Sequence, residues 1–186
     1  MQSAALQQTL ELVPWSGRLD AFDAPAGAAV TAWLQEQGLL TERLRACCPG
    51  RSGLTVVAEY EASISTADVA ELNASGTAAF VREVRLTCDD RPWVFAQTLI
   101  PQTTLARHRW LSALGDSALG ERLAAIPDIA RGPLEFTRLF APAALYQRAI
   151  RGDPRPPPAL WARRSWFALD GDRLMVQEVF LPEALA

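Results

Sequence analysis

The chain has 186 residues, which is the usual size of one domain and is enough to bury a sizeable core. Its 49% hydrophobic and 21% charged residues are ordinary for a globular protein, and its net charge of -3 argues against a nucleic-acid-binding module, which normally carries a basic excess. Residues 1–13 lack the features of a signal peptide, and no apolar run approaches the ~20 residues of a membrane span. We therefore expect a single domain over residues 1–186, located in the cytoplasm and not inserted in a membrane.

The cysteines Cys47, Cys48 and Cys88 form no CxxC pair, and their number is odd. This usage is typical of a reducing compartment, where disulfides are rare. It agrees with the expected location in the cytoplasm.

Hydrophobic spacing predicts helices in the first part of the chain. Residues 3–13 predict a short amphipathic helix, and Pro25 to Gln37 predict a stronger one that Gly38 ends. Thr41 is expected to cap a further helix that runs to Cys47 or Cys48. The last two helices predict a helix-turn-helix hairpin. Its corner consists of Gly38, Leu39 and Leu40, and no basic cluster accompanies it, so we discard a DNA-reading role.

Strands are predicted next. Leu54 to Glu61 alternates, and the polar segment 63–76 is expected to hold one helical turn. Phe80 to Cys88 also alternates, and Trp93 to Ile100 is apolar on both faces, as expected near the middle of a covered sheet. The residues expected to share the apolar face of the first strand are Leu54, Val56, Ala58 and Tyr60.

One charged residue, Arg82, interrupts the apolar face of the strand Phe80 to Cys88. A guanidinium stays charged, and burying it without a partner costs on the order of several kcal/mol or more. A nearby anion is needed to offset this cost. Arg82 is therefore expected either to meet a buried carboxylate or to bind the anion of a ligand.

A second helix pair is predicted over residues 102–126, with its corner at Gly115 to Ser117 and with Ser117 as a cap. His108 lies in it without metal-ligating neighbours, and we assign it no role. The segment Leu134 to Phe140 predicts a strand that carries Arg138. The proline-containing residues 141–158 predict a stiff extended connection.

The end of the chain predicts a hairpin. Trp161 to Leu169 and Leu174 to Leu181 flank Asp170 and Gly171, a strong turn signal. In the second of these strands Glu178 interrupts an apolar face, as Arg82 does earlier. Five or six strands joined by hairpins and helix pairs indicate an α+β domain with a single antiparallel sheet.

Two interpretations of these opposed charges stay open. Arg82 and Glu178 could pair inside the core, with Arg138 as a further donor, and such a pair would say little about activity. Alternatively, Arg82 could bind the carboxylate of a flat ring while Glu178 meets a polar group at its far end. The sequence contains no metal-ligand cluster, phosphate-binding loop or nucleophile elbow, so neither a metal nor a cofactor is expected.

Three stretches of the chain stand out together, namely VREVRLTCDDRPWVFAQTLIP (81–101), SALGERL (117–123) and WARRSWFALDGDRLMVQEVFLP (161–182). In sequence and in order they resemble the chorismate pyruvate-lyase family of ubiquinone biosynthesis. The resemblance implies an antiparallel sheet of about six strands flanked by helices, with two helix-turn-helix flaps over an internal ligand cavity. It also implies a cofactor-independent carbon–oxygen lyase that converts chorismate to 4-hydroxybenzoate and pyruvate.

The resemblance also implies the site residues. Arg82 matches the arginine that binds the carboxylate, and Glu178 matches the active-site glutamate. Leu119 and Leu40 match residues that line the cavity. Relatives commonly carry arginine at the position of Gln97, which suggests that a second cation near the site is missing here.

The fold also resembles that of a second class of protein, the effector-sensing domains of some bacterial transcription regulators. These domains bind small ligands without catalysing a reaction. The sequence favours the lyase, because few basic residues occur in the first helices. We expect a monomer that binds chorismate and 4-hydroxybenzoate and does not bind nucleic acid.

Overall fold

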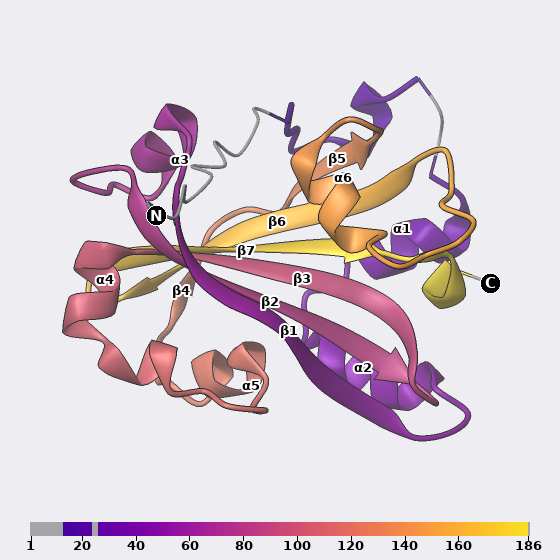
Figure 1. The fold of residues 1–186 in the computed structure, drawn as a ribbon, viewed down its shortest axis with the longest axis horizontal. Coiled ribbons are helices and arrows are strands. Elements are labelled where there is room, and N and C mark those ends of the chain that lie inside the picture. Colours follow the sequence, from indigo (N-terminus) through magenta and orange to yellow (C-terminus); the bar gives the residue numbers. More distant parts are fainter. Residues whose placement is uncertain (1–12, 24–25, 186) are drawn as a thin grey trace, which may run out of the picture.

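The fold is known from a computed structural model, which describes residues 13–23 and 26–185. Its centre is a seven-stranded sheet with the order β1-β2-β3-β7-β6-β4, and β5 also pairs with β6 (Figure 1). Every pairing is antiparallel, as the sequence predicted. The strands are β1 (Ser52–Ser63), β2 (Ala78–Cys88), β3 (Arg91–Pro101), β4 (Ala130–Arg131), β5 (Glu135–Leu139), β6 (Leu160–Leu169) and β7 (Asp172–Phe180).

Helices cover both faces of the sheet (Figure 1). The helices α1, α2 and α5 pack on one face, which we call the cavity face, and α3 and α6 pack on the other. The α-helices of the described residues are α1 (Ala28–Leu34), α2 (Leu40–Cys47), α3 (Thr66–Glu71), α4 (Gln102–Arg107), α5 (Leu119–Ala124) and α6 (Ala144–Ala149). Short 3-10 helices are Leu19–Ala21, Arg109–Ser112 and Pro182–Leu185.

The two predicted helix pairs are confirmed, but their caps are not. The N-cap of α2 is Leu39, so Thr41 lies inside the helix, and the N-cap of α5 is Ala118 rather than Ser117. In both cases the chain enters the helix from an extended residue without a side-chain cap. The first helix of the first pair is also shorter than predicted, Ala28–Leu34. The helix predicted over residues 3–13 lies outside the described residues, apart from Val13.

The expectation of an extended connection over residues 141–158 is wrong in part, because this segment contains α6. Leu145, Tyr146 and Ala149 of α6 are buried in one cluster with Phe95 and Val179 of the sheet. Prolines flank this short helix without interrupting it, so tertiary packing decided its formation.

The face predicted for β1 is also wrong beyond its middle. The register between β1 and β2 shifts between Val56 and Ala58, which marks a β-bulge or a similar irregularity. Leu54 therefore lies on the cavity face, whereas Tyr60 lies on the opposite face and donates to Glu83. The same shift brings Glu59 directly opposite Arg82 on the neighbouring strand.

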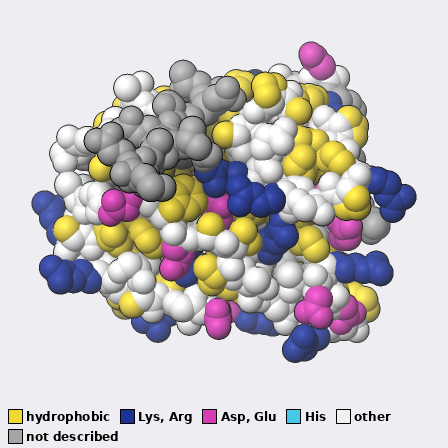
Figure 2. Space-filling model, in the orientation of Figure 1, with side chains coloured by type: hydrophobic (Ala, Val, Ile, Leu, Met, Phe, Trp, Pro, Cys, Tyr) yellow, Lys and Arg dark blue, Asp and Glu magenta, His cyan; other side chains and the backbone are white. Residues whose placement is uncertain are grey.

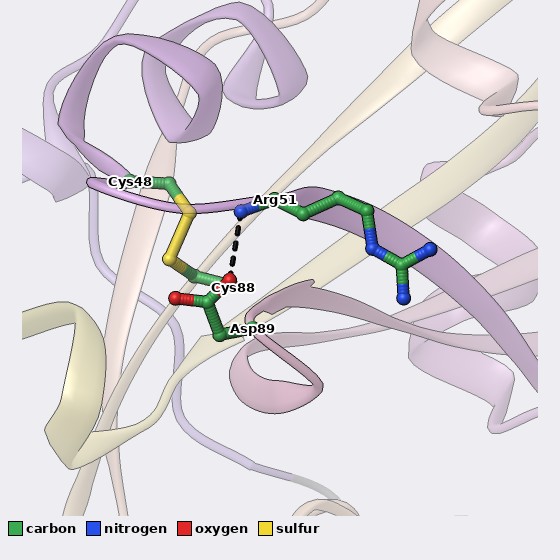
Figure 3. Close-up of a disulfide and its surroundings, with 4 residues drawn as sticks. All are labelled: Cys48, Arg51, Cys88 and Asp89. Atoms are coloured by element: carbon green, nitrogen blue, oxygen red, sulfur yellow. Dashed lines mark hydrogen bonds between the residues drawn. A yellow bond between two sulfur atoms is a disulfide. The ribbon is translucent and has the colours of Figure 1, made fainter.

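A disulfide joins Cys48, just after α2, to Cys88, the last residue of β2 (Figure 3). Beside it, the Arg51 backbone N–H donates to the Asp89 carboxylate at 2.8 Å. The number and spacing of the cysteines predicted no disulfide, and this pair corrects that expectation. The sequence could not reveal it, because the partners are 40 residues apart and meet only when α2 packs at the end of β2.

Basic, acidic and hydrophobic side chains are interspersed over the side of the molecule drawn in Figure 2. This mixture agrees with the small net charge of -3. Within residues 13–23 and 26–185, no helix has both the length and the apolar character needed to cross a membrane.

Candidate functional site

A cavity of about 300 Å³ lies between the cavity face of the sheet and the two helix pairs. Its volume is at the lower end of the range of small-molecule sites, ~300–1,000 Å³. The sheet supplies both apolar and polar residues, and the corners of the helix pairs cover them. Lining residues from the sheet include Val84, Leu86, Ala96, Thr98, Phe167 and Val176, and those from the cover include Gln37, Gly38, Leu39, Leu40, Leu119 and Leu123.

Arg82, Glu178, Leu119 and Leu40 all line this cavity. The structure thus brings together the four residues that the sequence singled out, from β2, β7 and the two helix pairs. Their roles in binding and catalysis remain predictions.

The first interpretation expected Arg82 to pair with Glu178, and this is wrong. The carboxylate partner of Arg82 is Glu59. Arg82 Nη1 lies 2.5 Å from Glu59 Oε1, and the side chain of Arg82 is only 2% exposed. Arg82 Nη2 donates to the carbonyls of Gly115 at 2.6 Å and Ser117 at 3.3 Å, which form the corner of the second helix pair. Arg82 therefore both lines the cavity and ties its cover to the sheet.

Glu178 pairs with Arg163, which lies opposite it on β6. Arg163 Nε donates to Glu178 Oε2 at 2.6 Å, and the arginine side chain is 1% exposed. No donor among the described residues reaches Glu178 Oε1, so this oxygen can accept from a ligand. Arg138, the third member of the expected core pair, instead lies over the rings of Phe140 and Trp161.

Arg163 also holds the end of α1. Its Nη1 lies 2.6 Å from the carbonyl oxygen of Glu36 and 3.2 Å from those of Trp33 and Leu34. The last carbonyls of a helix have no partner within the helix and carry partial negative charge, so a buried guanidinium is a suitable donor. Sequence reasoning missed Arg163, although its alternation with Ser165 and Phe167 on β6 placed it on the cavity face.

Arg131 is a third guanidinium in the cavity lining, and it was also missed. Its Nε donates to Ser165 Oγ at 3.0 Å, and its Nη1 donates to the Gln37 carbonyl at 3.0 Å. It belongs to β4, a strand of only two residues, which carries no pattern that sequence analysis can detect. Its place beside the cavity follows from the pairing of β4 with β6.

Gln97 does not lie in the cavity, so the expected loss of a second cation at this position is wrong. Thr98 is the register partner of Arg82, and its neighbour Gln97 therefore points to the opposite face. There Gln97 donates to the buried carboxylate of Glu83 at 2.9 Å. The further cations of the cavity are instead Arg131 and Arg163.

Glu36 organises the corner between α1 and α2. Its Oε1 accepts from the Gly38 N–H at 2.8 Å, and its Oε2 accepts from Arg43 Nη1 at 2.9 Å. Two interactions hold the pKa of the Glu36 carboxyl below its usual value. The larger effect comes from the hydrogen bond with the Gly38 N–H, and the next from the hydrogen bond with Arg43. These contacts position the residues that form one edge of the cavity.

This lowered pKa predicts a pH effect on stability. Because the pKa is lower in the folded state, the contacts of Glu36 stabilise the fold above the pKa of the unfolded chain, and this contribution is lost as the pH falls through the folded pKa. As the pH falls below about 5, the Glu36→Gln variant should therefore lose less free energy of unfolding than wild type does. The difference between the two losses should be at most about 1 kcal/mol. Melting curves from pH 7 to pH 3 would measure it, and parallel acid limbs would contradict it.

Among the residues described, no three His, Cys, Asp or Glu side chains gather as a set of metal ligands. His108 Nε2 lies 3.5 Å from Asp172 Oδ2, and neither residue belongs to the cavity lining.

The family model described as chorismate lyase matches residues 10–185. The chain belongs to the chorismate lyase family. Relatives named "Probable chorismate pyruvate-lyase" cover most of its length. The protein of Nitrosospira multiformis is 37% identical over 89% of this chain and 94% of its own, and that of Azoarcus sp. is 39% identical over 82% and 84%. That of Halorhodospira halophila is 37% identical over 99% of this chain and 93% of its own.

Solved structures confirm the fold of this chorismate lyase family member. The effector domain of PhnF from Mycobacterium smegmatis matches 80% of this chain and 91% of its own, with a TM-score of 0.55 and 14% identity. The C-terminal domain of the histidine utilization repressor from Pseudomonas syringae matches 72% and 94%, with a TM-score of 0.55 and 10% identity. At such identities the likeness concerns the fold alone.

Proposed function

We propose that the chain is a chorismate pyruvate-lyase that eliminates pyruvate from chorismate and leaves 4-hydroxybenzoate, the first committed step toward ubiquinone. The observation that carries this proposal is the cavity, because its apolar sheet residues suit a ring while Arg82 and Glu178 place opposite charges on its wall. Membership of the chorismate lyase family supports the same reaction.

The elimination breaks the bond between ring carbon C3 and the ether oxygen, and it removes the proton from C4. The ring becomes aromatic, and the released enolpyruvate takes up a proton to become pyruvate. Because aromatisation drives the reaction, the protein needs to desolvate the substrate, orient it and stabilise the charge that develops on the departing oxygen. We propose that no cofactor takes part.

In this proposal Arg82 holds the ring carboxylate, and Glu178 accepts a hydrogen bond from the C4 hydroxyl through its free Oε1. Leu40 and Leu119 close over the ring from the two helix pairs. The proton of C4 could pass to Glu178 or directly to the departing enolpyruvyl group. We favour an orienting role for Glu178, because its Oε2 is already occupied by Arg163.

The competing function is a ligand-binding domain without chemistry, which the likeness to effector domains of transcription regulators favours. We propose the enzyme over this alternative because the chorismate lyase relatives cover most of the chain at 37–39% identity. We also propose that the protein acts as a monomer in the cytoplasm.

Incubating the purified protein with chorismate tests the proposal. We expect equal amounts of pyruvate and 4-hydroxybenzoate, at a rate that a chelator does not change, since Arg82 and Glu178 supply the charges that the reaction needs. The measurement is coupled detection of pyruvate together with chromatography of the aromatic product. Binding of chorismate without pyruvate would favour the effector-type domain. Turnover that a chelator abolishes and a divalent ion restores would overturn the metal-free mechanism.

A further inference from the structure

The three guanidinium groups in the cavity lining differ in how their charge is balanced. Arg82 Nη1 lies 2.5 Å from Glu59 Oε1, and Arg163 Nε lies 2.6 Å from Glu178 Oε2. Within the described part of the chain, no carboxylate lies within ion-pair distance of Arg131. When Glu59 and Glu178 are counted against the three arginines, one positive charge remains in excess, and it is at Arg131.

The contacts of Arg131 are with neutral groups. It donates to the Ser165 hydroxyl and the Gln37 carbonyl, both at 3.0 Å, and it lies over the ring of Phe167 at 5.3 Å. Burial lowers the pKa of Arg131, the charge of Arg163 lowers it further, and Glu178 opposes the change. These contacts orient the guanidinium but leave its charge uncompensated, so an anion entering the cavity would gain from it.

The proposed substrate carries two carboxylates, one on the ring and one on the enolpyruvyl ether. Arg82 is assigned to the first. The second leaves with pyruvate, so the aromatic product has only one. A cation that meets the second carboxylate would bind the substrate and not the product. Arg131 comes from β4, across the sheet from Arg82 on β2, with β3, β7 and β6 between the two strands.

We propose that Arg131 binds the carboxylate of the enolpyruvyl group and thereby distinguishes the diacid substrate from the monoacid product. This inference rests on the proposed function, and it adds a specificity residue to that function. It also accounts for an uncompensated cation in a cavity whose other two arginines each have a carboxylate partner.

Two small ligands isolate this role from turnover. The compound 3-(carboxymethoxy)benzoate carries a ring carboxylate and an ether-linked carboxylate in the arrangement of the substrate, whereas 3-methoxybenzoate lacks the second acid. Calorimetric titration should show that wild type prefers the diacid. In Arg131→Met this preference should fall by about 10- to 100-fold, while affinity for the monoacid changes by no more than about twofold. Arg131→Lys should retain part of the preference, because it keeps the charge.

A surface arginine provides the matched control. Arg91 is exposed at the start of β3 and is not part of the cavity lining, so Arg91→Met removes one positive charge elsewhere and should leave the preference unchanged. In turnover, Arg131→Met should raise the KM for chorismate by about tenfold or more and leave inhibition by 4-hydroxybenzoate unchanged.

Two results would overturn the inference. Equal weakening of both ligands in Arg131→Met would mean that Arg131 serves only as a clasp between Gln37 and Ser165. An undiminished preference for the diacid in that variant would remove Arg131 from the ligand site. Neither result depends on turnover. If wild type forms no pyruvate, the proposed function fails on its own, and the titrations still decide whether Arg131 recognises a second carboxylate.

Discussion

Replacing Arg82 with alanine should abolish binding of 4-hydroxybenzoate, with a loss of at least about 100-fold in affinity, since a hydrogen-bonded charge pair with the ligand carboxylate is removed. The variant should also be less stable than wild type, by up to about 3–5 kcal/mol, the range for breaking a buried ion pair. We expect a value below the top of that range, because the Glu59 side chain is 35% exposed and can be solvated. Calorimetric titration and thermal melting would measure the two effects.

The matched control is Glu59→Gln, which removes the ion pair and leaves the guanidinium of Arg82 in place. This variant should lose stability but keep its affinity for 4-hydroxybenzoate, because Arg82 still has the Gly115 and Ser117 carbonyls to orient it. Unchanged affinity in Arg82→Ala would remove Arg82 from the ligand site. If Arg82→Ala does not fold and Glu59→Gln folds but no longer binds, binding depends on the ion pair that orders the site, and a direct contact of Arg82 with the ligand has no support.

The Glu178→Gln variant should lose turnover and product affinity to a similar extent, each by about one hydrogen bond to a charged group, roughly 1.5–3 kcal/mol. The amide keeps an oxygen that can face the C4 hydroxyl, whereas the charge is lost. Stability should fall as well, because Arg163 is 1% exposed and would remain as a buried cation without a carboxylate partner. Turnover, product affinity and melting temperature must be measured on the same preparation.

The double variant Glu178→Gln with Arg163→Met serves as the control for this loss of charge balance. Because Arg163 also donates to the carbonyls at the end of α1, the single Arg163→Met variant must be measured beside it. If the unpaired cation contributes to the instability, the double variant should be less destabilised than the sum of the two single variants. A fall in turnover of about 10²–10⁴ that far exceeds the loss of affinity, with an unchanged melting temperature, would show that Glu178 is the base for the C4 proton.

The sequence by itself determined the alternating faces of β2 and β7 and the charges that interrupt them. Alternation along β2 and β7 placed Arg82 and Glu178 on one apolar face, because successive side chains of any strand point to opposite sides. The Asp170–Gly171 turn set the final hairpin, since both residues adopt the positive φ angles that this turn requires. The family resemblance added Leu40 and Leu119, and the structure places both in the cavity lining.

Only the tertiary structure decided the partners of these charges. Glu59 meets Arg82 because the register shift in β1 reverses the faces after Val56, and Arg163 meets Glu178 through the register of β6 with β7. Arg131 reaches the cavity from a two-residue strand. The disulfide partners and α6 were missed for a related reason. Alternation is a local property that each strand shows by itself, whereas pairing depends on register, bulges and packing between segments that are distant in sequence.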